Sequence, residues 1–333
     1  MTSAFAFAFF LPSPAVNTRK EMILVTGANG QIGTVLTEAL RNAFGVEQIL
    51  ATDIKKPDGH IGPFEMLDIL NTQRITEIVD DYNITTIYHL AAILSANGEW
   101  NPQKTWDINL NGSLAILELA RAKGVRKVFF PSTIAVFGPT TPREMTPQHT
   151  VIEPSTVYGI SKVTNELWCN YYFNRYGLDV RSVRYPGIIS YQSMPGGGTT
   201  DYAVDIFHQA ILKGEYSCFL KENTCLPMMY MDDAIRATLE LMDAPVESIK
   251  IRTSYNLAAM SFTPGDLARE IKKHIPDFKI TYAPDHRQQI ADSWTESIDD
   301  HEARNDWGWA PEYDIATMTG EMLKQLKQKY HHV

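Results

Sequence analysis

The feature that most constrains this chain is a glycine-rich turn close to its N-terminal end. The apolar run 22–26 leads directly into a G-x-x-G-x-x-G pattern made by Gly27, Gly30 and Gly33. Glycines at these positions let a turn between a strand and a helix tighten, and they let backbone N–H groups approach a pyrophosphate at the positive end of the helix dipole. The turn therefore predicts a β-α unit that binds a dinucleotide.

Beyond this turn, short apolar runs alternate with amphipathic stretches, which is typical of β-α-β units around a parallel sheet. The pattern predicts strands at 22–27, 47–53, 64–68, 85–91, 126–132 and 179–187, and helices at 32–44, 72–82, 104–123 and 157–176. We therefore expect an α/β fold, a Rossmann-type doubly wound parallel sheet over residues 22–187. Residues 188–333 are expected to form a smaller C-terminal alpha+beta substrate-binding part, interleaved with returns to the main sheet.

Composition and charge exclude several classes of protein. The chain has 333 residues, of which 44% are hydrophobic and 21% charged, as in a soluble globular protein. Its net charge of -9, without any basic block, gives no reason to expect nucleic acid as a partner. The three cysteines form no C-x-x-C pair and the histidines show no ligand spacing, so we expect no metal. We also expect no association with a membrane.

Residues 1–21 stand apart as an N-terminal extension. They hold an apolar stretch at 4–11, serines and threonines, Arg19 and Lys20, and no acidic residue before Glu21. This composition has features of a mitochondrial transit peptide. We therefore expect a mitochondrial location, and the alternative is a disordered tail on a cytoplasmic protein.

An acidic residue at the end of the second predicted strand indicates which dinucleotide binds. Asp53 follows Gly33 by about twenty residues, where a carboxylate accepts hydrogen bonds from both ribose hydroxyls of NAD and repels the 2'-phosphate of NADP. NAD is therefore the expected cofactor. Ligands bind such sheets at the carboxyl ends of the strands. The third and fourth strands end there with Asp68, Ile69, Leu90, Ala91 and Ala92.

A tyrosine and a lysine one helical turn apart indicate the chemistry. Tyr158 and Lys162 leave the same face of their predicted helix, and Thr133 follows the fifth strand at the same edge of the sheet as the glycine turn. A tyrosine serves as a base near neutral pH only if its pKa falls by about three units, which corresponds to about 4 kcal/mol. We expect the lysine ammonium and a positive nicotinamide ring to supply that stabilisation, while Thr133 holds the alcohol oxygen.

These motifs together resemble the extended short-chain dehydrogenase/reductases. The glycine turn, a Ser or Thr ahead of V-[YF]-G and the Y-x-x-x-K pair are all present, and the resemblance covers Met22 to nearly the end of the chain. Counting back five residues from Gly138 selects Thr133 rather than Ser132 as the family's catalytic hydroxyl. The resemblance implies that the cofactor contacts Gly27, Asn29, Gly30, Gln31, Ile32, Gly33, Asp53, Ile54, Asp68, Ile69, Leu90, Ala91, Ala92, Asn109, Tyr158, Lys162, Tyr185, Gly187 and Ile188.

A narrower resemblance, to the short-chain branch that oxidises L-threonine, is carried by four unusual strings. They are RYPGIIS at 184–190, PGGGTTDYA at 195–203, ADSW at 291–294 and DWGW at 306–309. The resemblance implies NAD-dependent oxidation of L-threonine to L-2-amino-3-oxobutanoate, with Tyr158 as base and Lys162 and Thr133 as its partners. It also implies that the substrate contacts Ser95, Thr133, Tyr158, Thr199 and Trp294.

Two other functions remain open. A UDP-sugar epimerase or dehydratase would share every motif through Lys162, although the triple glycine at 196–198 argues against it. A non-catalytic NAD-binding regulator could keep the fold, because fold does not imply function. Such proteins commonly lose the tyrosine or the lysine, and this chain retains both.

Two predicted helices carry more apolar surface than contact with one sheet requires. Residues 114–120 are apolar nearly all round, and 167–173 are rich in aromatic side chains. A second apolar face indicates a second neighbour. We therefore expect a homodimer built as a four-helix bundle, with Leu117 at the interface. The alternative is that the second helix, or the C-terminal segment, of the same chain covers the first.

Overall fold

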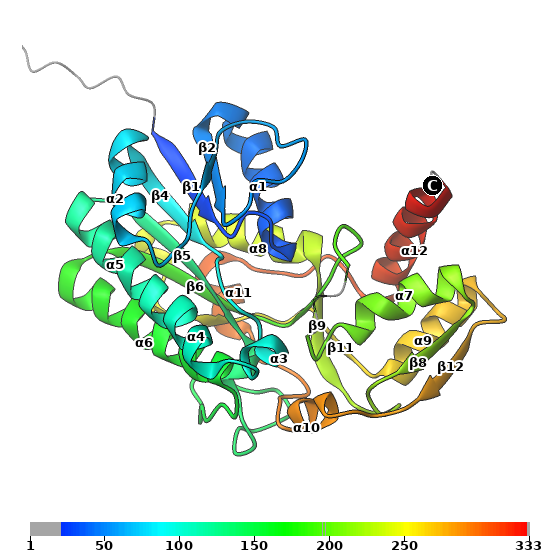
Figure 1. The fold of residues 1–333 in the computed structure, drawn as a ribbon. Coiled ribbons are helices and arrows are strands. Elements are labelled where there is room, and N and C mark those ends of the chain that lie inside the picture. The colour runs from blue at the N-terminus through cyan, green and yellow to red at the C-terminus, as the bar shows by residue number, and fades with distance from the viewer. Residues whose placement is uncertain (1–20, 195, 197, 332–333) are drawn as a thin grey trace, which may run out of the picture.

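A seven-stranded parallel sheet forms the centre of the molecule (Figure 1). The computed structural model describes residues 21–194, 196 and 198–331. The strand order is β10-β6-β5-β4-β1-β2-β3, which confirms the expected doubly wound α/β fold. The strands are β1 (Met22–Thr26), β2 (Ile49–Asp53), β3 (Phe64–Met66), β4 (Ile84–His89), β5 (Lys127–Thr133), β6 (Asp179–Tyr185) and β10 (Tyr255–Asn256).

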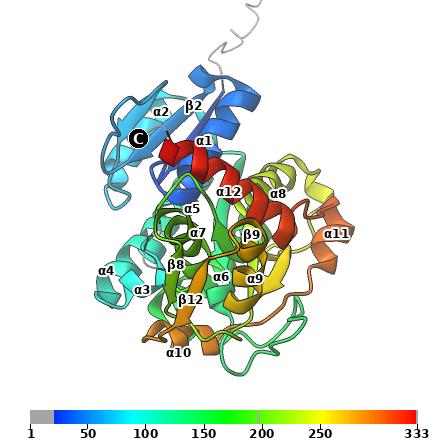
Figure 2. The ribbon, with the colours of Figure 1, turned by 90° about the vertical axis from the view of Figure 1, so that its right-hand side faces the viewer.

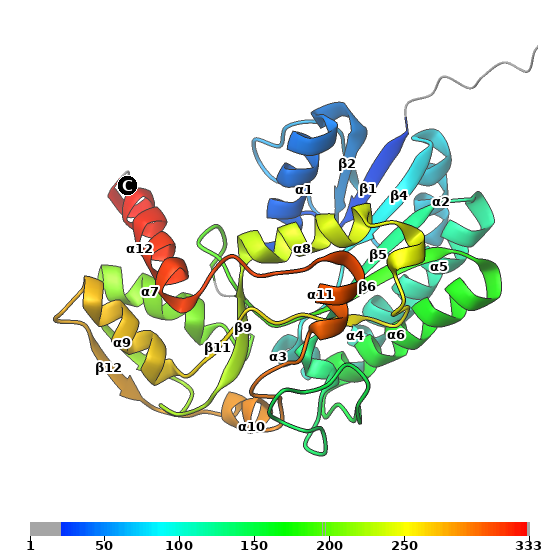
Figure 3. The same ribbon diagram turned by 180° about the vertical axis from the view of Figure 1, so that it is seen from behind.

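Helices cover both faces of this sheet, and each face has its own apolar core (Figure 3). One face packs against α1 (Gln31–Phe44) and α8 (Met231–Asp243). The other packs against α2 (Thr72–Asp81), α5 (Gly112–Lys123) and α6 (Val157–Tyr176). Because parallel strands are buried on both faces, their apolar side chains are continuous along the strand rather than alternating.

A C-terminal lobe lies beside the sheet, and Figure 2 views the molecule from the side of this lobe. Its strands are β7 (Gly187–Ile189), β9 (Leu226–Tyr230) and β11 (Met260–Phe262) in one sheet, and β8 (Glu215–Cys218) and β12 (Lys279–Tyr282) in another. Its helices are α7 (Tyr202–Leu212), α9 (Pro264–His274), α10 (Arg287–Asp292) and α12 (Ile315–His331). The remaining short elements are η1 (Val46–Gln48), α3 (Ser95–Gly98), α4 (Pro102–Trp106), η2 (Asp107–Asn111), η3 (Ile134–Val136), η4 (Val246–Ser248) and α11 (His301–Trp307).

Two predicted elements are interrupted in the structure. The helix expected at 104–123 contains one π-helical turn, η2, from which the Asn109 side chain accepts the N–H of Ile93 at 2.8 Å and donates to its carbonyl oxygen at 2.9 Å. The strand expected at 179–187 ends at Tyr185, because Pro186 has no N–H to continue the ladder. After Pro186 the chain enters β7, in the second sheet.

The expected position of Leu117 at a dimer interface is wrong. Leu117 is 1% exposed and lies in the core that α5 shares with α6, together with Cys169 and Tyr172. The second helix of the same chain therefore covers this part of α5. The large apolar side chains that remain exposed on α6 are those of Ile160, Leu167, Tyr171 and Tyr176.

None of the helices in the described part of the chain combines the length and the apolar character needed to cross a bilayer. Within those same residues, no group of three or more His, Cys, Asp or Glu side chains is arranged to hold a metal ion. The three cysteines are free thiols.

Candidate active site

Two adjoining cavities of about 240 Å³ each lie at the carboxyl ends of the parallel strands. Both are lined by Gly27, Gly30, Leu90 and Ala92, so they form one cleft that runs past the glycine turn. The cleft lies where the strand order reverses, between β1 and β4. Ligands of doubly wound sheets bind at this point.

Two glycines of the turn, Gly27 and Gly33, leave no room for a side chain. Gly27 has a φ of 69°, and a Cβ there would lie 2.6 Å from the backbone nitrogen of Ala91. Gly30, Gln31 and Ile32, at the N-terminus of α1, line the cleft, where the free N–H groups and the helix dipole favour a pyrophosphate.

Asp53, at the end of β2, lines the second cavity. Its carboxylate accepts the backbone N–H of Asn29 at 3.0 Å and that of Ile54 at 2.8 Å. These bonds hold the carboxylate at the rim while its remaining lone pairs can accept ribose hydroxyls. The glycine turn and Asp53 thus fit the two ends of the adenosine diphosphate half of NAD.

The structure brings nearly all the predicted cofactor residues to this cleft. The first cavity is lined by Gly27, Gly30, Gln31, Ile32, Gly33, Leu90, Ala92, Tyr158, Lys162, Tyr185, Gly187 and Ile188. The second adds Asp53, Ile54, Asp68, Ile69 and Ala91. Two predicted residues lie outside both linings. Asn29 bonds to Asp53 through its backbone, and Asn109 holds the loop after β4 through Ile93.

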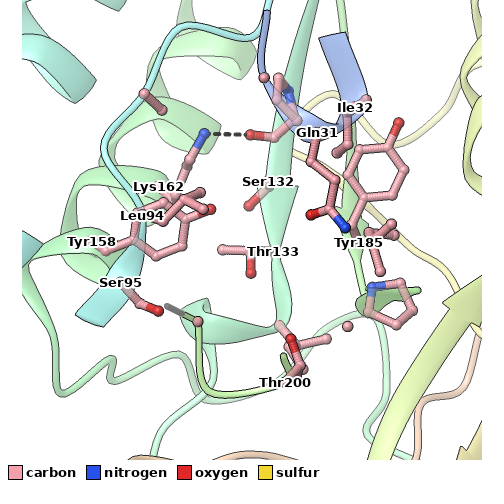
Figure 4. Close-up of a pocket in the computed structure, with 18 of the residues that line it drawn as sticks. Gln31, Ile32, Leu94, Ser95, Ser132, Thr133, Tyr158, Lys162, Tyr185 and Thr200 are labelled. Atoms are coloured by element: carbon pink, nitrogen blue, oxygen red, sulfur yellow. Dashed lines mark hydrogen bonds between the residues drawn. The ribbon is translucent and has the colours of Figure 1, made fainter. Parts of the chain in front are cut away.

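The predicted catalytic residues meet in the first cavity (Figure 4). Tyr158 and Lys162 lie in the first two turns of α6, which begins after the side chain of Thr156 caps the N–H of Gly159 at 3.1 Å. Thr133 is the last residue of β5, and its hydroxyl oxygen accepts the N–H of Ala135 at 3.2 Å. The Thr133 side chain also forms a hydrogen bond with Tyr158, which lowers the pKa of the tyrosine.

Burial dominates the protonation of the tyrosine and the lysine. It raises the pKa of Tyr158 to about 12, an effect that the hydrogen bond from Thr133 partly offsets. Burial lowers the pKa of Lys162 to about 8, against the opposing effects of Cys169 and Glu166. The lysine Nζ donates to the carbonyl oxygen of Pro131 at 2.7 Å and lies 5.6 Å from the centroid of the Tyr158 ring. In this arrangement burial dominates the pKa of Tyr158, because the lysine ammonium donates to a carbonyl oxygen rather than to the phenol.

The predicted substrate residues close the same cavity from three separate segments. Ser95 comes from α3, Thr199 from the loop before α7, and Trp294 follows α10. Their exposed fractions are 6%, 1% and 5%. The Thr199 hydroxyl has no hydrogen-bond partner among the described residues, and Figure 4 shows Ser95 and Thr200 near Thr133.

A buried polar group behind the catalytic residues was not predicted from the sequence. Glu166 accepts the hydroxyl of Ser132 at 2.5 Å and forms an ion pair with Arg184 at 2.7 Å. One signal was available: Glu166 follows Lys162 by four residues, on the same helix face. The chemistry of a carboxylate buried beside an arginine could not be recognised without the partner strand.

Comparison with known proteins agrees with this site. The family model described as "NAD dependent epimerase/dehydratase family" matches residues 23–258. The mitochondrial L-threonine 3-dehydrogenase of Bos taurus is 49% identical over 308 residues, which cover 91% of this chain and 82% of the bovine protein.

Two solved structures are similar over nearly the whole chain. The GalE-like L-threonine dehydrogenase from Cupriavidus necator, in its holo form, has a TM-score of 0.90 at 52% identity, covering 92% of this chain and 99% of its own. A monomeric L-threonine 3-dehydrogenase from a metagenome, in its apo form, has a TM-score of 0.90 at 51% identity with the same coverage of 92% and 99%. By its cofactor cleft, its catalytic motif and these similarities, the chain belongs to the NAD dependent epimerase/dehydratase family, as an NAD-dependent oxidoreductase.

Proposed function

We propose that the chain oxidises the β-hydroxyl of L-threonine to give L-2-amino-3-oxobutanoate. The observation that carries this proposal is the meeting of Tyr158 and Thr133 in the first cavity, a pocket of about 240 Å³ that adjoins the cavity lined by Asp53. That pocket is closed by Ser95, Thr199 and Trp294, as expected for a small polar substrate rather than a nucleotide-sugar. The similarity to proteins named as threonine dehydrogenases supports the same substrate.

In this proposal the phenolate of Tyr158 accepts the proton of the substrate hydroxyl. The hydroxyl of Thr133 donates to the same oxygen of the substrate and keeps it in line with the base. Lys162 holds a positive charge behind the phenol, which favours the phenolate. The chemistry that bound NAD would supply is the acceptance of a hydride from the β carbon, so that the alcohol would lose one proton and one hydride and become a ketone.

The zwitterionic end of the amino acid is assigned to Ser95 and Thr199. A buried hydroxyl that lacks a partner costs about 1–3 kcal/mol, and a polar substrate group next to Thr199 would remove that cost. Thr199 also precedes α7, whose N-terminal end favours a carboxylate. Trp294 covers the pocket and excludes water from it.

The function is tested by assaying the purified protein with NAD and a panel of L-threonine, D-threonine, L-serine and UDP-sugars. We expect turnover with L-threonine, together with weaker or no turnover of the other compounds. Preference for a UDP-sugar would support the epimerase or dehydratase alternative. Tight NADH binding without turnover of any compound would support a non-catalytic regulator.

We also propose a homodimer, in which the exposed apolar residues Ile160, Leu167 and Tyr171 of α6 pack against their symmetry mates. These residues are 45%, 60% and 47% exposed in the single chain. Repeated apolar exposure at helical spacing is typical of an interface. One similar structure is described as monomeric, so the mass in solution has to be measured for this chain.

A mitochondrial location is the third part of the proposal. It is supported by the composition of residues 1–21 and by the word "mitochondrial" in the name of the bovine relative. Residues 1–20 lie outside the described part of the chain. Expression of the full chain and of a chain beginning at Met22, each with a C-terminal fluorescent tag, tests this location. Cytosolic fluorescence from both chains would contradict it.

A further inference from the structure

Three consecutive residues at the end of β5 are tied to one face of α6. The three β5 residues are Pro131, Ser132 and Thr133, and their respective partners are Lys162, Glu166 and Tyr158. Because the partners are spaced four residues apart, they lie one above another along the helix. The contacts of Pro131 and Thr133 belong to the catalytic group, whereas the contact between Ser132 and Glu166 has no part in the proposed chemistry.

The contact between Ser132 and Glu166 is almost completely buried, and Glu166 has a second partner. Ser132 and Glu166 are 4% and 3% exposed. Ser132 is in register with Arg184 on β6, so both side chains leave the sheet on the face that α6 covers. Arg184 donates to both carboxylate oxygens of Glu166. Its Nε lies 3.0 Å from Oε1 and 3.3 Å from Oε2, and its Nη2 lies 2.7 Å from Oε2.

The far side of the guanidinium is fixed as well. Arg184 Nη1 donates to the side-chain oxygen of Asn256 at 3.0 Å and to the carbonyl oxygen of Gln148 at 3.2 Å. Asn256 belongs to β10, at the edge of the main sheet. Three adjacent strands, β5, β6 and β10, thus converge on one carboxylate of α6.

We propose that Glu166 is a positioning residue, which acts through Ser132 to hold the end of β5 in register with α6. This register brings the Thr133 hydroxyl to Tyr158 and the Pro131 carbonyl to Lys162. The inference rests on the proposed function, because it assigns Glu166 a role in aligning the base and its partners. Bidentate bonds to a planar guanidinium fix a carboxylate in position and orientation, which a single bond does not.

A second buried carboxylate that is paired with arginine, but lies away from the catalytic residues, serves as a control for Glu166. Asp179, at the start of β6, is bonded by Arg181 and Arg252 and is similarly buried. Arg181 also donates to the carbonyl oxygens of Leu241 and Ala244 at the end of α8, and neither Asp179 nor its two arginines line the cleft. A buried ion pair by itself is often no better for stability than apolar packing. A variant of Asp179 therefore shows the effect of losing a buried ion pair in general, which can be subtracted from the effect of losing the Glu166–Arg184 pair.

Glu166 also acts on the charge of Lys162. The groups that face this lysine are Tyr158, Glu166 and Cys169 on its own helix and His89 from β4, while Arg184 lies behind Glu166. The carboxylate opposes the effect of burial on the pKa of the lysine. Neutralising the Glu166 carboxylate removes a negative charge that raises the pKa of Lys162, and it leaves the positive charge of Arg184 unbalanced. Lys162 should therefore lose its proton at a lower pH.

The experiment compares Glu166→Gln, Ser132→Ala and the double variant with the control Asp179→Asn. We expect kcat to fall about 10- to 100-fold in the first two, while KM and the affinity for NADH stay within about threefold, as in the loss of a transition-state interaction. The double variant should lose little more than Glu166→Gln alone, because both changes remove one contact. Asp179→Asn should keep its kcat.

A second readout does not depend on turnover. In the cofactor-free enzyme labelled with 13C at lysine Cε, the Lys162 resonance, assigned with Lys162→Met, should titrate at a lower pH in Glu166→Gln than in wild type. It should be unmoved in Asp179→Asn. If Glu166→Gln does not fold, Ser132→Ala, which leaves the ion pair intact, carries the kinetic test alone.

The outcomes separate this inference from the proposed function. Full activity in Ser132→Ala, or a loss of NADH affinity that accounts for its lower rate, would overturn the positioning role while leaving Tyr158 as the base. An unmoved Lys162 titration in folded Glu166→Gln would overturn the electrostatic part. If Tyr158→Phe itself keeps full activity, the proposed function fails first.

Discussion

The carboxylate of Asp53 accepts the backbone N–H of Asn29 at 3.0 Å, and this bond ties the end of β2 to the glycine turn after β1. One side chain thereby shapes both ends of the adenosine site. We expect Asp53→Ala to weaken NAD binding about tenfold or more, because charge-assisted bonds are lost. Discrimination against NADP should also relax, because the repulsion is lost. Titration of NAD and NADP by fluorescence, with Asp53→Asn as the uncharged isostere, measures both effects, and an unchanged NAD/NADP ratio would remove Asp53 from cofactor selection.

Tyr158→Phe should lower kcat by about 10²- to 10⁴-fold, the usual contribution of a positioned acid or base. NADH affinity should hardly change, because the phenol transfers a proton rather than anchoring the cofactor. Thr133→Val is the matched variant that removes only the neighbouring hydroxyl. Rates for Tyr158→Phe within about threefold of wild type would exclude it as the base.

Lys162→Met should move the acid limb of the pH–rate profile to higher pH. Burial raises the pKa of Tyr158 to about 12, so the base needs nearby positive charge to ionise near neutral pH. Without the ammonium, the phenolate is less favoured, activity at pH 7 falls, and it recovers only as the pH rises. Lys162→Arg keeps the charge and should shift the limb less. An acid limb at the same pH in Lys162→Met and wild type would contradict this role.

Asp179→Asn should lower the free energy of unfolding by about 3–5 kcal/mol at pH 7, as expected when one partner of a buried ion pair is removed. Burial alone would raise the pKa of Asp179, but the bonds and charges of Arg181 and Arg252 hold it below its ordinary value. A lowered carboxyl pKa stabilises the fold above the unfolded-state pKa, and this contribution is lost as the pH falls through the folded-state value. Urea unfolding at pH 7 and at about pH 3 should therefore show the wild type and the variant converging in acid.

Leu167→Glu should reduce the mass in solution from twice the 37.6 kDa of one chain to a single chain, without unfolding it. The side chain is 60% exposed on α6, so a charge costs little in the monomer but is buried in the proposed bundle. Ile61→Glu, at an exposed apolar position away from α6, is the control. Light scattering that finds a wild-type monomer with full activity would contradict the homodimer.

The elements that local chemistry determines could be predicted from the sequence. The helix expected at 157–176 has those bounds in the structure, because Thr156 supplies a side-chain cap and Gly177 takes the left-handed conformation that ends a helix. The glycine turn and Asp53 also lie where expected, since their spacing reflects a single β-α-β unit.

The features that were not predicted depend on contacts between distant segments. The π turn in 107–111 forms where Asn109 holds the loop at Ile93, and no local propensity marks it. From the sequence, Leu117 belongs to an apolar face of α5 with no evident neighbour, and the structure shows that α6 covers it. The resemblance selects Thr133 rather than Ser132 as the catalytic hydroxyl, but the contact of Ser132 with Glu166 depends on how α6 packs against β5 and could not be predicted.

Pro186 separates the main sheet from the second sheet by a single residue, and the residues on either side of it, Tyr185 and Gly187, both line the catalytic cavity. Two trans peptide links span at most about 7–8 Å. The distance between the floor of the cofactor cleft and the base of the C-terminal lobe is therefore set covalently, not by side-chain packing. Substitutions in the C-terminal lobe can therefore change the shape of the pocket to suit another alcohol. The short link at Pro186 keeps the cofactor and the substrate aligned while the specificity of the pocket changes.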